Sequence, residues 1–278
     1  MTLAVVRPAH PAEFYLDRVA RCLEAAPVPL SGELHAGIDL GTSTVVLTVT
    51  DGDGLPAFVA TEPCEALRDG VVVDFGGAVE AVTRLVETAA AGTGHRIDAA
   101  AAGYPPGIGP TESRACRFVL ERAGLDCTTL TDEVSAANSV LGISDGVLVD
   151  VGAGSTGVGI FRDGELVEVG DVPGGGHHLN LILAGALGTS IEEAERRKRT
   201  DGADHLPILR PGLERIAVSI ERLSAGHGSL PVHLAGGGLM LPGAAGVVSQ
   251  YLERAVVEYP HALYITPLGL AWSSQWQT

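Results

Sequence analysis

One short pattern occurs twice in this chain of 278 residues, and it limits the folds that the chain can adopt. In residues 36–54 an apolar run ends in an aspartate, a glycine and two hydroxyl residues follow, and a valine-rich run leads to an Asp-Gly turn. Residues 147–164 have the same layout. Such a repeat indicates two related units. Strand-like runs joined by glycine turns predict that each unit opens with an antiparallel meander.

Helical patterns follow each predicted meander. The spacing of apolar residues predicts helices over 77–91 and 111–123 after the first, and over 190–199 and 213–224 after the second, with a further strand over 232–235. Strands that alternate with helices are typical of α/β folds. We therefore expect two α/β lobes.

The first 34 residues precede this repeat. Apolar residues at helical spacing predict a short helix over 11–26, which the prolines at 27 and 29 end. We expect this helix to pack on the body of the protein or to stay mobile. The alternative is an amphipathic peptide that docks on a larger assembly.

Composition excludes several kinds of partner. The formal net charge is −16, so we expect neither nucleic acid nor an anionic membrane as the main partner, because both require a basic surface. We see no apolar run of the roughly 18 residues that a membrane span requires, and no secretory signal. The four cysteines show no CxxC spacing and are expected to be free thiols, which favours a cytoplasmic protein.

The repeated turns carry the chemistry that the residues themselves suggest. Asp39 and Asp150 each end an apolar strand, where a buried carboxylate is costly without a cation. Two such carboxylates on related lobes suit Mg²⁺ held through water. Glycine lets backbone N–H groups approach phosphate oxygens, and hydroxyls add donors. One such hairpin would be ordinary, but two in register favour a phosphate clamp made of Gly41, Thr42, Ser43, Gly152, Gly154, Ser155 and Thr156.

Three segments in order resemble the nucleotide loops of the actin, heat-shock chaperone and sugar kinase superfamily. GIDLGTST (37–44) resembles the first phosphate loop, VDVGAGSTGVGIF (149–161) the second, and LAGGGLMLPG (234–243) the adenosine loop. The resemblance implies an actin-like ATPase fold with two ribonuclease H-like lobes around a nucleotide cleft. The expected parts are the N-terminal extension 1–34, lobe I over 35–146, lobe II over 147–262, and a segment 263–278 that returns to lobe I.

Further motifs extend the resemblance to individual residues. TDEVSAANSVLG (131–142) resembles the connecting segment of the chaperones. On that match, Glu133 would orient the attacking water near the γ-phosphate. EEAERRKR (192–199) resembles the chaperone helix that holds the nucleoside. On that match, Glu195 and Lys198 would hold the ribose and adenine. Lys198 is the single lysine of the chain. The alternative for this helix is a solvated charged surface. The remaining expected nucleotide contacts are Gly175, Gly176, Gly236, Gly237 and Gly238.

The segment GGGHHLN (174–180) departs from the chaperone pattern. Asn180 stands where the family has a carboxylate, which puts one contact near the metal in doubt. Adjacent histidines rarely share one metal, so His177 and His178 are interpreted as features of a loop and not as a zinc site.

Residues 34–278 as a whole resemble the EutJ family of ethanolamine-utilization proteins. The resemblance implies an ATP-binding, chaperone-like protein of the cytoplasm, associated in many cases with bacterial microcompartments. ATP and Mg²⁺ would be its cofactors, with Asp39 and Asp150 holding the metal and acting with Glu133 in catalysis. Ethanolamine ammonia-lyase or microcompartment proteins would be its clients.

The expected ATPase is slow. Heat-shock chaperones have a catalytic lysine in the lobe that spans residues 35–146 here, and this chain has no lysine there. Arg68 would replace its charge but not its geometry. The main alternative is an actin-like ATPase that forms filaments. A cobalamin-lyase reactivating factor would need a swivel-domain insertion, for which we expect no room here. A small-molecule kinase would need a catalytic aspartate beside an acceptor pocket, and we identify neither in the sequence.

Overall fold

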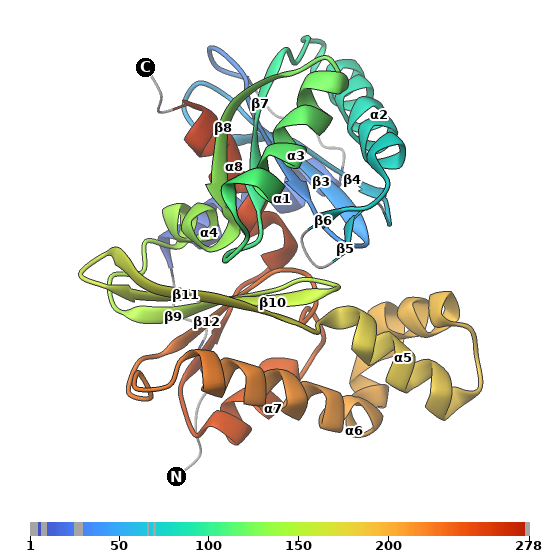
Figure 1. Ribbon diagram of the computed structural model, residues 1–278, viewed down its shortest axis with the longest axis vertical. Helices are drawn as coiled ribbons and strands as arrows, with labels where there is room; N and C mark the ends of the chain where they lie inside the picture. Colours follow the sequence, from blue (N-terminus) through green and yellow to red (C-terminus); the bar gives the residue numbers. More distant parts are fainter. Residues whose placement is uncertain (1–4, 7–9, 25–29, 66, 69–70, 276–278) are drawn as a thin grey trace. The chain divides into compact units, whose positions relative to one another are not determined.

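The computed structural model describes every residue except 1–4, 7–9, 25–29, 66, 69–70 and 276–278 (Figure 1). The chain divides into two compact units. Ala9–Gly142 and Leu263–Thr278 form one, which we name the Asp39 unit. Met1–Pro8 and Ile143–Ala262 form the other, the Asp150 unit.

The Asp39 unit contains a five-stranded sheet in the order β4-β3-β2-β7-β8. Its first three strands form an antiparallel meander, and β7 and β8 then add in parallel to β2. The strands are β2 (His35–Leu40), β3 (Thr44–Thr50), β4 (Pro56–Pro63), β7 (Ala99–Tyr104) and β8 (Asp126–Asp132). A separate short hairpin joins β5 (Leu67–Arg68) to β6 (Val71–Val72).

The Asp150 unit repeats this topology. Its sheet has the order β1-β13-β12-β9-β10-β11, in which β9, β10 and β11 form the meander and β12 and β13 add in parallel. The strands are β9 (Gly146–Val151), β10 (Ser155–Arg162), β11 (Glu165–Pro173), β12 (Val232–Ala235), β13 (Val256–Glu258) and the N-terminal β1 (Val5–Val6). The repeat in the sequence is therefore a repeat of topology, and the predicted α/β fold with two related lobes is confirmed.

Helices cover both faces of the sheet in the Asp39 unit. α2 (Phe75–Thr93) and α3 (Pro110–Arg122) pack on the strand side that carries Ile38 and Leu40. α8 (Ile265–Gln275) packs against β2 so closely that a Cβ on Gly37 would overlap the backbone of Ala271. Successive strand residues point to opposite faces, so Asp39 lies on the face of Gly37 and not on that of the main core.

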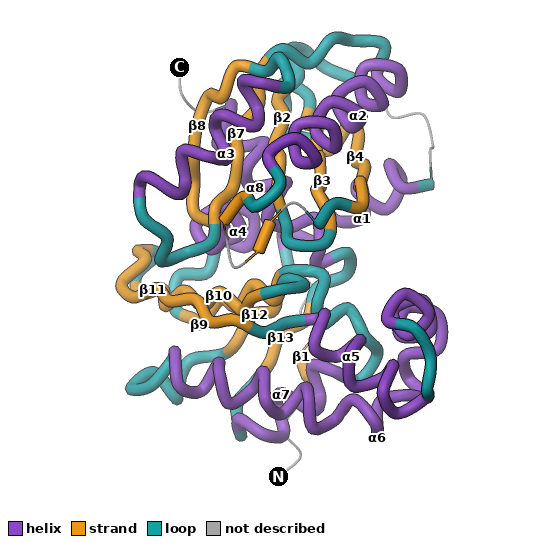
Figure 2. The backbone as a smooth tube through the Cα atoms, turned by 45° about the vertical axis from the view of Figure 1, so that its right-hand side comes forward, coloured by secondary structure: helices purple, strands orange, loops and turns teal. Residues whose placement is uncertain are grey.

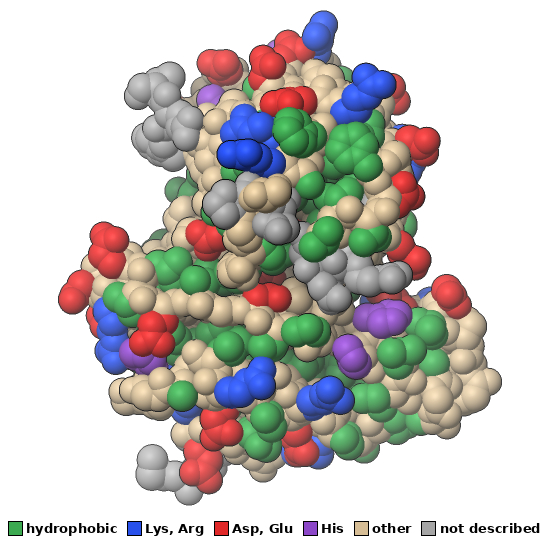
Figure 3. All heavy atoms as spheres, viewed as in Figure 1, with side chains coloured by type: hydrophobic (Ala, Val, Ile, Leu, Met, Phe, Trp, Pro, Cys, Tyr) green, Lys and Arg blue, Asp and Glu red, His purple; other side chains and the backbone are tan. Residues whose placement is uncertain are grey.

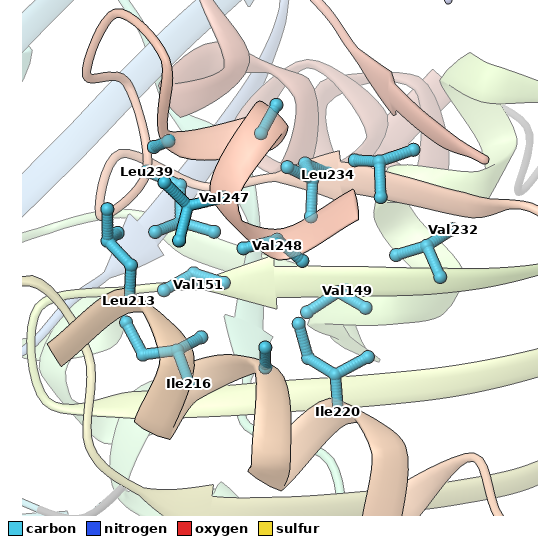
Figure 4. Close-up of a cluster of buried hydrophobic side chains, with 14 of the residues drawn as sticks. Val149, Val151, Leu213, Ile216, Ile220, Val232, Leu234, Leu239, Val247 and Val248 are labelled. Carbon is cyan, nitrogen blue, oxygen red and sulfur yellow. The ribbon is translucent and has the colours of Figure 1, made fainter. Parts of the chain in front are cut away.

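The core of the Asp150 unit lies between its sheet and three helices (Figure 2). Figure 4 shows Val149 and Val151 of β9 directed toward Leu213, Ile216 and Ile220 of α6. Burying each such side chain stabilises the fold by about 1.5–3 kcal/mol. The helices are α5 (Gly176–Leu187), α6 (Ile191–Leu223) and α7 (Ala244–Leu252). By the same alternation, Asp150 points away from this core.

The predicted helices after the first meander correspond to α2 and α3. The two predicted after the second meander are parts of α6, which continues between them with non-helical backbone angles only at Asp201. The interpretation of His177 and His178 as loop residues was wrong, because both lie in the first turn of α5. They are exposed there.

The N-terminal helix α1 (Pro11–Leu23) packs on the Asp39 unit. Leu16 and Val19 are fully buried, and Tyr15 meets Trp272 of α8 edge-on with ring centroids 4.9 Å apart. Arg18 Nε donates to the Pro56 carbonyl at 2.9 Å. The interpretation as a short helix packed on the body is therefore supported. The prolines that were expected to end it, and the side chain of Arg68, lie outside the described residues.

Three observations bear on what the composition predicted: the positions of the basic side chains, the composition of the helices and the state of the cysteines. On the face shown in Figure 3, Lys and Arg side chains lie in small separate groups. None of the described helices combines the length and the apolar composition that crossing a bilayer requires. The four cysteines are free; three are buried, and Cys22 is half-buried.

Candidate functional site

Asp150 lies next to a tight turn at the end of β9. It is the last residue but one of the strand and pairs with Gly157 of β10. The turn between the strands closes with a hydrogen bond from Gly152 N to Ser155 O at 3.0 Å. The Asp150 side chain is mostly buried, so its carboxylate sits at the edge of the apolar strand that the sequence predicted.

The segment before α5 is bonded to this turn along its length. Gly174 N donates to Gly154 O at 2.7 Å, Gly176 N to Gly152 O at 2.9 Å, and His177 N to Ala153 O at 2.9 Å. A Cβ on Gly175 would overlap Gly152 O, so only glycine fits at that position. Gly175 and Gly176, which were predicted to contact the nucleotide, thus lie beside Gly152 and Gly154, for which the same was predicted.

Thr156 has a different role from the one that the sequence suggested. Its side chain is fully buried, and its hydroxyl donates to the Gly174 carbonyl at 2.7 Å. The hydroxyl proton is therefore used to hold the segment before α5, and it is not offered to a ligand. Ser155, at the start of β10, is only partly buried.

The glycines after β12 reach the same turn. Gly238 N donates to Val151 O at 2.7 Å, and a Cβ on Gly238 would lie 2.6 Å from Gly152 O. Gly236 has φ +79°, and a Cβ there would overlap the Asp150 carboxylate. Gly237 accepts a hydrogen bond from Met240 N at 3.4 Å. Three glycine segments from distant parts of the chain therefore meet around Asp150.

Lys198 joins α6 to this group. Its ammonium donates to the Gly176 carbonyl at 3.2 Å, and a Cβ on Gly176 would lie 3.6 Å from Lys198 Nζ. Burial lowers the pKa of Lys198, while the nearby Glu195 carboxylate acts in the opposite direction. A partly desolvated ammonium is suited to an anionic or hydrogen-bonding ligand.

Glu195 lies one turn before Lys198, on the side of α6 that meets α5. It accepts hydrogen bonds from Asn180 Nδ2 and, at 2.5–3.0 Å, from the Arg199 guanidinium. Burial raises the pKa of Glu195, but the bonds from Arg199 and Asn180 and the charges of Lys198 and Arg199 outweigh it, so the pKa is lowered overall. Glu195 and Lys198 therefore face the same place on α5 and are not part of a freely solvated surface.

The Asp39 unit presents the equivalent turn. Asp39 is also the last residue but one of its strand and pairs with Val46 of β3. The turn consists of Gly41, Thr42 and Ser43, and a Cβ on Gly41 would lie 2.6 Å from Thr44 O. Asp39 and Asp150 thus occupy the same register in two sheets of the same topology.

Glu133 belongs to the Asp39 unit and begins α4 (Glu133–Leu141). The preceding Asp132 caps that helix by accepting from Ser135 N at 2.9 Å. Gly103 near the end of β7 lies next to Glu133, since a Cβ there would make ordinary contact with Glu133 Cγ at 3.5 Å and a closer one with Leu270 of α8 at 3.0 Å. Asp39 near the end of β2 and Glu133 just after β8 both lie at the carboxyl ends of parallel strands, with β7 between the two. This is a usual place for ligand-binding residues in α/β sheets.

The sequence predictions fall into two sets, one in each unit. The Asp39 unit holds Asp39, Gly41, Thr42, Ser43 and Glu133, and the Asp150 unit holds Asp150, Gly152, Gly154, Ser155, Thr156, Gly175, Gly176, Glu195, Lys198, Gly236, Gly237 and Gly238. Sequence analysis did not identify two residues next to Glu133, Gly103 and Asp132, or the bond that Asn180 makes to Glu195. A glycine near the end of an alanine-rich strand was the only sequence signal for Gly103.

The donor atoms present suit a hard cation. Within the described residues, no three His, Cys, Asp or Glu side chains gather closely enough to hold a metal ion. Asp39 and Asp150 each supply one carboxylate, and carboxylate oxygens together with water are what Mg²⁺ prefers. Each carboxylate, taken by itself, is of the kind that binds Mg²⁺ through water, and neither belongs to a set of zinc-type ligands.

Comparison with known proteins gives matches along most of the chain. The family model described as "Cell division protein FtsA" matches residues 147–268, and the one described as "MreB/Mbl protein" matches residues 57–184. The ethanolamine utilization protein EutJ of Escherichia coli (strain K12) is 37% identical over 94% of this chain and 93% of its own length.

Solved structures agree with these matches. The crystal structure of ethanolamine utilization protein EutJ from Carboxydothermus hydrogenoformans superposes with a TM-score of 0.88 at 35% identity, covering 94% of this chain and 97% of that one. MreB 5 of Spiroplasma citri, in a structure bound to AMPPNP, has a TM-score of 0.67 at 14% identity, with 87% and 95% covered. The second likeness shows the fold, which is that of actin-like ATPases.

Proposed function

Because the chain belongs to the EutJ family of ethanolamine utilization proteins, we propose that it binds ATP and acts as a chaperone-like protein of ethanolamine utilization. Its clients would be ethanolamine ammonia-lyase or microcompartment proteins. The observation that carries ATP binding is the meeting of three glycine segments around Asp150, with Lys198 beside them. Glycines that let the backbone approach a ligand closely are typical of phosphate sites.

Each part of the nucleotide has candidate residues. The phosphates would contact Gly152, Gly154 and Ser155, the segment Gly175-Gly176, and the turn Gly41–Ser43 of the Asp39 unit. The nucleoside would lie near Glu195, Lys198 and the glycines at 236–238. Asp39 and Asp150 would hold Mg²⁺ through water, and the ion would neutralise phosphate charge.

The hydrolytic role falls to Glu133. Phosphoryl transfer depends mainly on positioning and charge stabilisation, and a carboxylate at the start of a capped helix is well placed to orient a water molecule. Residues 35–146 contain no lysine that could act as the catalytic lysine of the heat-shock chaperones. Hydrolysis should therefore be slow, and its main effect should be a change of conformation. We therefore place the protein among weak Mg²⁺-dependent ATPases.

Calorimetry and single-turnover kinetics test this proposal. Titration with ATP and ADP should show binding that strengthens with Mg²⁺ and weakens on Lys198→Met. In single-turnover hydrolysis Glu133→Ala should lower the rate about 100-fold with little change in affinity. The proposal fails if the wild-type protein takes up no adenine nucleotide, and the role of Glu133 fails if fast turnover survives its replacement.

The client and the location follow from the family. We expect the protein in the cytoplasm, where it would meet ethanolamine ammonia-lyase or the proteins of a microcompartment. Affinity capture with and without ATP, from cells growing on ethanolamine, should recover one of these in a nucleotide-dependent manner. Recovery of the protein alone would count against a client.

The second candidate is an actin-like ATPase that forms filaments. The matches to the FtsA and MreB/Mbl family models favour it. Sedimentation and light scattering at rising protein concentration, with ATP and with ADP, separate the two functions. A concentration threshold for pelleting that appears only with ATP would favour the filament.

A further inference from the structure

Asn180 stands out among the polar residues of the Asp150 unit. Its side chain is 2% exposed, in the second turn of α5, and its Nδ2 donates to Glu195 Oε2. Its Oδ1 is buried, and within the described part of the chain it has no hydrogen-bond partner. A buried acceptor without a partner is costly, so stability alone does not account for this arrangement of the amide.

The orientation of the amide supplies an explanation. With Nδ2 toward Glu195, the amide gives the carboxylate a hydrogen bond and leaves its own oxygen unpaired. The opposite orientation would bring two oxygens together. The amide of Asn180 is therefore oriented to donate a hydrogen bond to Glu195, which lies one turn from Lys198 on α6.

Asn180 is the side chain of α5 that donates a hydrogen bond to Glu195. Its own helix supplies Lys198 and Arg199, and only these two and Asn180 act on its protonation besides burial. The ionisable side chains on the other elements packed against α6 are His177 and His178 of α5, Tyr251 of α7, Arg162 of β10, and Glu165, Glu168 and Asp171 of β11.

We propose that Asn180 is a positioning residue, which fixes the Glu195 carboxylate beside Lys198. This inference rests on the proposed nucleotide function, because Glu195 and Lys198 form the nucleoside end of that site. A carboxylate at position 180 would instead lie within hydrogen-bonding distance of Glu195. Two carboxylates so close share a proton, which would make the site sensitive to pH. The neutral amide avoids this sensitivity.

The test compares Asn180→Asp, which has nearly the same shape, with Asn180→Ala. Affinity for ATP should vary little between pH 6 and pH 8 in the wild-type protein. In Asn180→Asp it should weaken about tenfold from pH 6 to pH 8, because the shared proton is lost. In Asn180→Ala affinity should fall at every pH without a new pH dependence. Gln250→Glu adds the same charge to the exposed α7 position that Arg210 contacts, and it should leave the pH profile flat.

A second measurement needs no nucleotide. Lys198 is the only lysine, so the only amines that a reagent such as acetic anhydride can acetylate are Lys198 and the N-terminal amine, which serves as an internal control. The midpoint of Lys198 labelling against pH should rise by about one pH unit in Asn180→Asp, because a second negative charge stabilises the ammonium. In Gln250→Glu it should not move.

The two measurements separate the two claims. If Asn180→Asp changes neither profile while remaining folded by circular dichroism, the positioning role is overturned. If the wild-type protein binds no nucleotide but the Lys198 midpoint shifts as expected, the nucleotide function fails and the positioning of Glu195 stands.

Discussion

Gly236 shows how one residue limits the geometry of the site. Its positive φ and the nearness of the Asp150 carboxylate both exclude a side chain. Gly236→Ala should therefore lower the free energy of unfolding by about 2 kcal/mol through backbone strain and displace Asp150. Urea unfolding measures the first effect and ATP titration the second.

Gly185 is the matched control for that substitution. It lies in α5, and a Cβ there would meet nothing within 4 Å. Gly185→Ala should stabilise the protein by up to about 1 kcal/mol through helix propensity and leave ATP binding unchanged. Equal effects of the two substitutions would show that the overlap at Gly236 has no importance.

The thiols give a pH-dependent prediction at the same scale. Burial raises the pKa of Cys22 to about 11 and that of Cys116 to about 12. A thiol whose pKa is raised has little thiolate at pH 8, and its reactivity rises with pH toward the raised pKa. With a disulfide reagent at pH 8, both should react at least about 100-fold more slowly in the native protein than in urea. Rapid native labelling of Cys116 would contradict its burial.

At the scale of elements, two capped helices allow a direct comparison. Asp74 caps α2 by accepting from Gly77 N at 3.0 Å, and Asp132 caps α4 in the same way immediately before Glu133. Replacing either aspartate by alanine should cost about 1 kcal/mol of stability.

Only Asp132→Ala should also lower the rate of ATP hydrolysis, because it loosens the turn that holds Glu133. Thermal unfolding and single-turnover kinetics on both variants provide the check. A similar loss of rate in Asp74→Ala would mean that general destabilisation explains the effect.

Two helices show where reading the sequence failed. The glycine-rich start of α5 resembles a loop, but its first amides bond to Gly152 and Ala153 of a distant turn, and no local pattern reveals that contact. For α6, the sequence predicted two separate helices over 190–199 and 213–224, whereas the structure has one that continues through Pro207 and Pro211. Both are exposed, so the carbonyl groups deprived of a helical donor can reach water, while Leu209 and Leu213 keep the helix packed.

For the whole molecule, the repeated turn was the most informative feature. It predicted two sheets of one topology, since strand alternation and turn chemistry are local properties that survive in any context. The same register placed Asp39 and Asp150 correctly within their strands. The contacts of Gly103 and Asn180 were not predictable, because each depends on an element that packs against it from elsewhere in the chain.

The net charge of −16 also acts on the whole molecule. Repulsion among like charges opposes the compact state and is screened by salt. The melting temperature at pH 7.5 should therefore rise by several degrees between 20 mM and 500 mM sodium chloride. An unchanged or lower melting temperature would show that ion pairs, such as those of Glu193 with Arg196 and Arg197, outweigh the repulsion.

A chain with a single lysine has a single bond that a lysine-specific protease can cut, the one after Lys198. That bond lies inside α6, where an intact helix cannot enter a protease active site. Cleavage would therefore require the first part of α6 to unfold locally, and it would divide the chain once into two fragments of predictable size. The rate at which the intact band disappears from a gel therefore measures how readily this one helix opens.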